Sequence, residues 1–228
     1  MRYDNSVRNP KEGFFMKTEL VFILDRSGSM AGLESDTIGG FNAMVEKQKR
    51  EPGEALVTTV LFDITWEILH DRLPLEKVPP MTAKDYSVGG CTALLDAVGG
   101  TVRHIARIHK YARREDVPDR TLVVITTDGL ENASRTYTYD RVQKLIRHEQ
   151  EKYGWEFLFL GANIDAAAEA ARFGIGADRA ADYHCDSEGT ALNYEVLGDA
   201  IRQVRSGARL SAAWKADIDA DYHRRDRK

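Results

Sequence analysis

Short apolar runs alternate with amphipathic segments along this chain. The first run, residues 20–24 (LVFIL), is β-prone and contains no polar position. Such a run is typical of a strand that is covered on both faces of a parallel sheet. Further strands are predicted at residues 55–62, 122–125, 155–160 and 180–184. Residues 65–69 follow the second strand so closely that we expect them to pair with it as a hairpin at the edge of the sheet.

Segments with apolar residues at helical spacing separate these strands. The clearest covers residues 93–111, where aliphatic side chains form one stripe and the last turns are basic, as the helix dipole favours. Further helices are predicted at residues 37–50, 140–152, 166–173 and 190–204. Strands that alternate with helices predict a doubly wound, Rossmann-like α/β fold, with a mostly parallel sheet, one antiparallel edge strand and helices on both faces.

The pattern divides the chain into three parts. Residues 1–15 precede the first patterned segment and are expected to be an extension, either a mobile one or a segment upstream of a start at Met16. Residues 16–207 carry all the predicted strands and helices and contain no long linker, so we expect them to form one domain. Residues 208–228 are mostly polar and end in DIDADYHRRDRK, which predicts a solvated tail.

Composition narrows the classes of function. The chain has 228 residues, of which 43% are hydrophobic, and this is enough for one large core. Its 32 basic and 36 acidic residues leave a net charge of −4, so we expect no nucleic-acid partner.

The two cysteines, Cys91 and Cys185, form neither a disulfide framework nor a CxxC metal motif. No apolar run reaches the roughly 18 residues of a membrane span, and no signal-peptide pattern is present, so we expect a cytoplasmic protein without a membrane partner.

The first predicted strand ends in a loop that carries candidate ligands, and ligands of doubly wound folds bind at the carboxyl ends of strands. The sequence DRSGSM at residues 25–30 places a carboxylate and two hydroxyls at alternate positions, and Gly28 allows a bend that turns all three toward one point. Thr92 directly precedes the helix predicted at residues 93–111, and Asp128 follows the strand predicted at residues 122–125. The side chains that we expect to converge are those of Asp25, Ser27, Ser29, Thr92 and Asp128.

The chemistry of these five side chains favours a hard cation. Hydroxyl and carboxylate oxygens, without imidazole or thiolate, select Mg2+ or Mn2+ over Zn2+ or Cu2+. Because the set carries only two formal negative charges, a bound ion would keep enough electrophilic character to accept a carboxylate from another molecule. Mg2+ is therefore the expected cofactor, with Mn2+ as a substitute.

Three motifs occur in a recognisable order: DRSGSM after the first strand, GGCTALLDA around Thr92, and TTDG at Asp128. Together they resemble the von Willebrand factor A-type (VWA) domain with a metal-ion-dependent adhesion site (MIDAS), over about residues 17–207. The family pattern is D-x-S-x-S with a distant Thr and a distant Asp, and this chain matches every element. The resemblance implies a metal shell of Asp25, Ser27, Ser29, Thr92 and Asp128, some of them acting through water.

The resemblance also implies a function. In such a domain an acidic side chain of a protein partner completes the coordination of Mg2+, and no catalysis is implied. The stretches DGLENAS and GWEFLFLGANIDA look most like those of stand-alone cytoplasmic bacterial or phage members. We therefore expect a scaffold or regulator in a bacterial or phage stress system.

Two alternatives remain open. The motifs GxSxG and GxxxxGK[ST] are absent and the first loop lacks GxGxxG, which excludes a nucleophile-elbow hydrolase, a P-loop and a dinucleotide site. A Mg2+-dependent phosphohydrolase survives, in which Asp63 or Glu131 would activate a water. The second alternative is a structural domain without metal function. We place Asp63 outside the metal shell, and we expect Cys91 to pack beneath the site.

Overall fold

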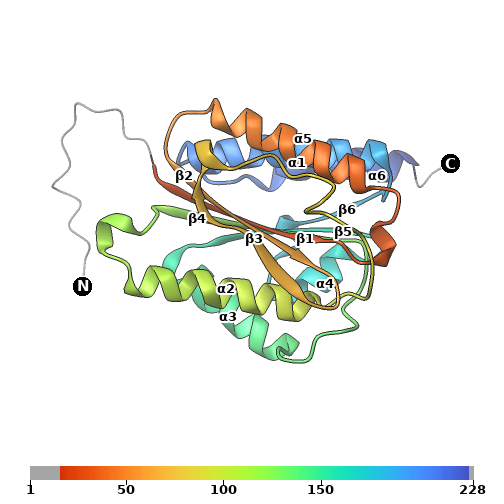
Figure 1. The fold of residues 1–228 in the computed structure, drawn as a ribbon, viewed down its shortest axis with the longest axis horizontal. Coiled ribbons are helices and arrows are strands. Elements are labelled where there is room, and N and C mark those ends of the chain that lie inside the picture. The colour runs from red at the N-terminus through yellow and green to blue at the C-terminus, as the bar shows by residue number, and fades with distance from the viewer. Residues whose placement is uncertain (1–15, 226–228) are drawn as a thin grey trace.

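Six strands form one mixed sheet in the part of the chain that the computed structural model describes, residues 16–225 (Figure 1). Their order is β3-β2-β1-β4-β5-β6. Strands β2 and β3 are antiparallel, and every other neighbouring pair is parallel. The strands are β1 (Thr18–Asp25), β2 (Ala55–Phe62), β3 (Trp66–Pro74), β4 (Arg120–Thr127), β5 (Glu156–Ala162) and β6 (Ala180–Tyr183). The extension expected at residues 1–15 lies outside the described residues.

Helices cover both faces of this sheet (Figure 1). On one face lie α1 (Glu34–Lys49), α5 (Ser187–Arg205) and α6 (Ala216–Arg225), and on the other lie α2 (Leu94–Tyr111), α3 (Tyr139–Tyr153) and α4 (Ala166–Arg172). The side chains of β1 alternate between the two layers. Leu20 and Phe22 pack in one layer, and Val21 and Ile23 pack in the other. The predicted doubly wound α/β fold with one antiparallel edge strand is therefore confirmed.

The strand order reverses between β1 and β4. From β1 the chain adds β2 and β3 on one side, and β4, β5 and β6 extend the sheet on the other side. Such a switch point is where open α/β sheets bind ligands, outside the carboxyl ends of the strands. Asp25 is the last residue of β1, and Asp128 directly follows β4. Both acidic residues of the predicted site therefore lie at the switch point.

The edge strand β3 is longer than the hairpin partner predicted at residues 65–69. It runs on to Pro74, with an irregularity in its pairing to β2. The added part is difficult to recognise because it contains charged residues such as Arg72. In the structure, Arg72 donates a hydrogen bond to the buried carboxylate of Glu19 on β1 at 2.9 Å. The polar residues that interrupt the apolar pattern are thus bound to the sheet itself.

The C-terminal segment does not form the solvated tail that we predicted from residue 208 onward. It contains α6, which packs beside α5 and β6 (Figure 1). Leu210, Trp214 and Ile218 are buried in the core, with 3%, 7% and 1% of their surface exposed. Ile218 lies in α6, Trp214 lies in the short 3-10 turn before it, and Leu210 lies in the loop that follows α5. These apolar residues are too sparse to stand out among the polar and charged residues around them.

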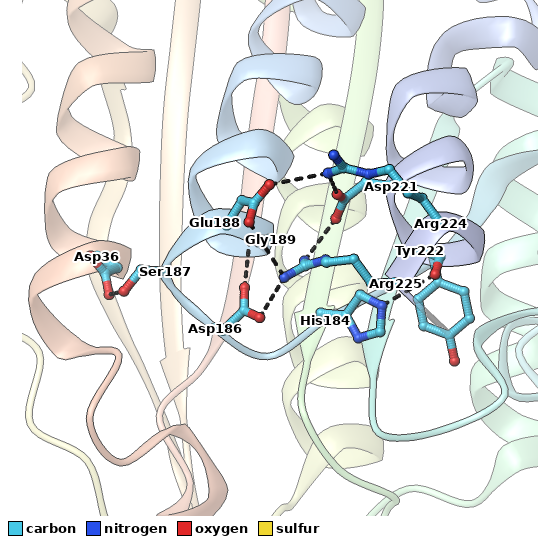
Figure 2. A network of polar contacts seen from close by, with 10 residues as sticks. All are labelled: Asp36, His184, Asp186, Ser187, Glu188, Gly189, Asp221, Tyr222, Arg224 and Arg225. Carbon is cyan, nitrogen blue, oxygen red and sulfur yellow. Dashed lines mark hydrogen bonds and ion pairs between the residues drawn. The ribbon is translucent and has the colours of Figure 1, made fainter. Parts of the chain in front are cut away.

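Charged residues of α6 hold the loop between β6 and α5 (Figure 2). The guanidinium of Arg225 binds the carboxylates of Asp186 at 2.6 Å and Asp221 at 2.7 Å. Arg224 binds Asp221 as well, at 2.6 Å. Asp186 also caps α5, because its carboxylate accepts a hydrogen bond from the backbone N–H of Gly189 at 2.8 Å. The last helix therefore stabilises the start of the helix before it.

The burial of α6 predicts the effect of truncating its central apolar residue. Ile218→Ala should lower the free energy of unfolding by about 2–5 kcal/mol, because it removes buried methyl groups and leaves a cavity. His223→Ala, at an exposed position of the same helix, is the control and should change it by less than about 0.5 kcal/mol. Urea unfolding followed by circular dichroism measures both. Equal effects of the two substitutions would show that α6 lies outside the core.

Candidate metal centre

Asp25 is 1% exposed, and its carboxylate is the acceptor at the middle of the candidate site. One oxygen accepts a hydrogen bond from the backbone N–H of Ser27 at 2.7 Å. The other accepts from the hydroxyl of Thr127 at 2.7 Å and from the backbone N–H of Asp128 at 3.3 Å. Burial raises the pKa of Asp25, and these hydrogen bonds oppose the rise. The carboxylate thus joins the loop after β1 to the end of β4.

Ser27 and Ser29 lie in the tight turn that follows β1. Their hydroxyl oxygens are 3.2 Å apart, which is the side-by-side arrangement expected from their spacing. Ser27 is buried and Ser29 is exposed. The backbone N–H of Gly28 donates to the carbonyl of Gly90 at 3.1 Å. A Cβ at Gly28 would lie 3.3 Å from that carbonyl oxygen, so the close approach of the two loops favours glycine.

Thr92 lies just before α2, and the loop after β4 holds it there. Its backbone N–H donates to the side-chain oxygen of Asn132 at 2.9 Å, and its carbonyl accepts from the N–H of Asn132 at 3.0 Å. The carboxylate of Glu131 accepts from the N–H groups of Leu95 and Ser134, each at 2.7 Å. A carboxylate at the first turn of a helix is favoured by the helix dipole. Asn132 therefore positions Thr92, and Glu131 holds the first turn of α2 to the same loop.

Asp128 is 3% exposed, and two further loops hold its side chain. The amide of Asn163, which follows β5, donates to one carboxylate oxygen. The thiol of Cys185, which follows β6, donates to the other at 3.0 Å. Burial, together with this contact, raises the pKa of Cys185 above its usual range, so the thiol keeps the proton that it donates. The carboxyl ends of β1, β4, β5 and β6 all contribute to the centre.

The structure brings the loops that carry the five predicted residues together near Gly129. A Cβ at Gly129 would lie 3.5 Å from the hydroxyl oxygen of Thr92 and 3.7 Å from that of Ser29. Glycine therefore leaves space next to both oxygens. Ser29 in turn contacts Ser27, and the backbone of Asp128 is bound to Asp25.

This donor set fits a cation that prefers oxygen. Three hydroxyls and two carboxylates are hard ligands, which suit Mg2+ or Mn2+. Within residues 16–225, no three His, Cys, Asp or Glu side chains are grouped so that they could hold a metal ion. A metal at this centre would therefore need the hydroxyl oxygens of Ser27, Ser29 and Thr92 as ligands.

Four residues that hold the site escaped the sequence analysis. They are Tyr86 and Thr127, which donate hydrogen bonds to Asp25, and Asn163 and Cys185, which donate to Asp128. Thr127 lies inside the TTDG motif, and Asn163 and Cys185 follow the ends of strands, so a rule that inspects every strand end would have found these three. Tyr86 lies in an irregular loop and gives no such signal.

Cys91 was expected beneath the site and is instead exposed. Its neighbour Thr92 is 4% exposed. Both residues lie in the loop before α2, so no helix or strand periodicity predicts which of the two is buried.

Residues 7–173 match the family model described as "VWA domain containing CoxE-like protein", which covers well over half of the chain. The chain belongs to this VWA family. The resemblance inferred from the three motifs is thereby confirmed. No curated protein matches the chain.

Solved structures share the fold of this VWA domain at low sequence identity. Proximal thread matrix protein 1 from the mussel byssus, solved with a zinc-occupied MIDAS motif, is 16% identical with a TM-score of 0.56, over 84% of this chain and 46% of that chain. The vWF domain of the type V pili tip protein Mfa5 from Porphyromonas gingivalis is 11% identical with a TM-score of 0.57, over 87% and 98%. A von Willebrand factor type A protein from Catenulispora acidiphila is 16% identical with a TM-score of 0.54, over 82% and 42%. This VWA domain thus spans just under half of the mussel protein.

None of the helices in the described part of this VWA domain is long and apolar enough to cross a membrane.

The space beside Gly129 predicts the effect of a single methyl group. Gly129→Ala should preserve the fold, because its Cβ would make ordinary contacts with the two hydroxyls. It should weaken Mg2+ binding at least about tenfold, because the methyl group covers those oxygens. Gly89→Ala is the matched control, since a Cβ there meets nothing within 4 Å. Isothermal titration with MgCl2 measures both, and equal affinities would show that the metal does not bind at this place.

Proposed function

We propose that this VWA domain binds a protein partner through a divalent cation, and that an acidic side chain of the partner completes its coordination. The proposed ligands are Asp25, Ser27, Ser29, Thr92 and Asp128. Mg2+ is the proposed ion, with Mn2+ as a substitute, because every donor is an oxygen. When bound, the ion would supply a positive charge and a coordination position for a carboxylate. The observation that carries the proposal is the meeting of the Ser29 and Thr92 hydroxyls beside Gly129.

The charges around the candidate metal centre support the idea that an acidic partner is attracted only when a metal ion is bound. Arg26, the basic residue inside the D-x-S-x-S motif, is paired with Asp63 at 3.0 Å and also with Glu67. Its side chain is only 13% exposed, so it offers little to an incoming carboxylate. The whole chain carries a net charge of −4. Without a cation, an acidic partner would therefore meet a field that repels it.

The hydrogen bonds of two carboxylates favour binding over phosphoester hydrolysis. A hydrolase of this kind would use Asp63 or Glu131 to activate a water. Asp63 is engaged by Arg26 and by the backbone N–H of Thr65 at 2.9 Å. Glu131 accepts hydrogen bonds from three backbone N–H groups and from the hydroxyl of Ser134. Both carboxylates therefore hold loops in place and have little capacity left for a water.

We further propose a setting for this activity. Residues 16–207 would form the VWA unit, with α6 as an addition that completes its core. The protein would act in the cytoplasm of a bacterium or in a phage-infected cell, as a scaffold or regulator in a stress system. The two cysteines are free thiols, which supports a reducing compartment. The zinc-occupied MIDAS of the mussel protein supports a divalent metal at the same place in the fold.

The proposal predicts that partner capture depends on both Mg2+ and the hydroxyl of Ser29. Ser29 is exposed, so Ser29→Ala removes a proposed ligand without opening a cavity. Tagged protein in a native lysate should recover its partner in Mg2+, and Ser29→Ala should recover at least about tenfold less. Quantitative mass spectrometry of the captured proteins measures the difference.

Ser35→Ala, which removes an exposed hydroxyl on α1, is the matched control and should capture as well as the natural sequence. EDTA should release the partner, and an excess of Mg2+ should restore it. A partner that stays bound in EDTA would contradict the metal-dependent mechanism.

A further inference from the structure

A cavity lies at the opposite end of the sheet from the candidate metal centre. Its volume is about 370 Å3, within the range of small-molecule sites. The last turns of α2 and α3 and the start of β4 line it, and Figure 1 shows these two helices side by side under the sheet. The metal centre lies beyond the opposite end of β4. The cavity is therefore separate from the proposed partner-binding site.

The carboxylate of Glu149 borders this cavity. Glu149 is 4% exposed, and its side chain makes no hydrogen bond or ion pair with any residue in the range 16–225. Helix α3 ends at Tyr153, and the next residue, Gly154, adopts a φ of 68°. This left-handed turn brings Trp155 back beside Glu149, and the N–H of Trp155 donates to the carbonyl of Glu149 at 3.2 Å. A buried carboxylate without a partner calls for a ligand that can donate to it.

The other charged groups that line the cavity already have partners. His109 contacts the carboxylate of Glu19 at 3.1 Å, and Asp119 accepts a hydrogen bond from the backbone N–H of Lys17 at 3.0 Å. Arg120 donates a hydrogen bond to the carbonyl of Gly207 at 3.4 Å. The ammonium nitrogen of Lys110 lies 5.3 Å from the ring centre of Tyr111. Lys152 and His148 face the ring of Tyr153 at the same end of α3. Of the two carboxylates that line the cavity, Asp119 therefore has a hydrogen-bond donor and Glu149 has none in the described part of the chain. The cations His148, His109 and Lys152 lower the pKa of Glu149 by less than burial raises it.

Two further features favour a cation here. The C-terminal ends of α2 and α3 both border the cavity, and helix C-termini attract positive charge. Trp155 and Tyr153 supply aromatic surface, which attracts organic cations. Burial raises the pKa of Glu149, and a cation beside the carboxylate would lower it again.

We propose that this cavity binds an organic ammonium ion, with the ammonium group at the carboxylate of Glu149 and an apolar body against Trp155. The ammonium group is either that of a free amine or that of a lysine side chain on another protein, since both present the same chemistry. The site is independent of the metal centre and of the partner proposed for it.

Three probes of similar shape and different charge test this inference. They are phenethylamine, 2-phenylethanol and 3-phenylpropionate, each titrated into the natural chain and followed by calorimetry and by the amide resonances of residues around the cavity. Phenethylamine should bind at least about tenfold more tightly than the other two. It should shift the amide resonances of Glu149 and Trp155. Tighter binding of 3-phenylpropionate, or no binding of the amine, would overturn the proposal.

Glu149→Gln keeps the shape of the side chain and removes its charge. It should weaken phenethylamine at least about tenfold and leave 2-phenylethanol unchanged. Glu151→Gln, at an exposed position of the same helix, is the matched control and should change neither. Burial makes the charge of Glu149 unfavourable. The Glu149→Gln variant should therefore unfold at the same urea concentration as the natural chain or at a higher one. Unchanged amine binding by Glu149→Gln would overturn the proposal.

Nα-acetyl-lysine amide separates the two sources of the ammonium group. Tighter binding of this compound than of phenethylamine would identify a lysine side chain as the ligand, and the reverse would identify a free amine. Either result supports the site only if Glu149→Gln weakens the tighter ligand.

Discussion

The buried carboxylate of Asp25 is the interaction on which the candidate site depends. It ends the central strand and accepts hydrogen bonds from Ser27 in one loop and from Thr127 and Asp128 in another. Hydrogen bonds to a charged group contribute about 1.5–3 kcal/mol each, and at Asp25 they offset only part of the effect of burial, which raises the pKa of this carboxyl. The two loops are thus held together where the sheet reverses its strand order. The meeting of the two loops that carry Asp25, Ser27, Ser29 and Asp128 follows from this topology and from this one acceptor.

Further contacts surround the candidate metal centre and extend to α6, at the end of the described chain. The thiol of Cys185 donates to Asp128, and the loop that carries this thiol is bound by Arg225 of α6 through Asp186. An unbroken series of contacts therefore joins the C-terminal helix to the metal centre. At the other end of β4, the cavity at Glu149 shares none of these contacts, so the ligand proposed for it is independent of the partner proposed for the candidate metal centre.

Local pattern and motif spacing predicted much of this structure, and tertiary packing decided the rest. β1 and β4 each contain an unbroken apolar run, residues 20–24 and 122–125, and parallel neighbours end at the same edge of a sheet, so Asp25 and Asp128 could be placed together from the sequence. Helix α6 could not be predicted, because Ile218 and its few apolar neighbours are buried only when they pack against α5 and β6. Cys185 was missed for a similar reason, since its contact with Asp128 exists only once β6 has joined the sheet.

If the hydroxyls of Ser27 and Ser29 hold a cation at the end of β1, its position can be seen directly. Anomalous diffraction from crystals grown with Mn2+ provides this measurement. We expect one strong anomalous peak in contact with both hydroxyl oxygens. A strong peak at another place, or no peak beside Ser27 and Ser29 in excess Mn2+, would contradict the metal centre and the binding mechanism that rests on it.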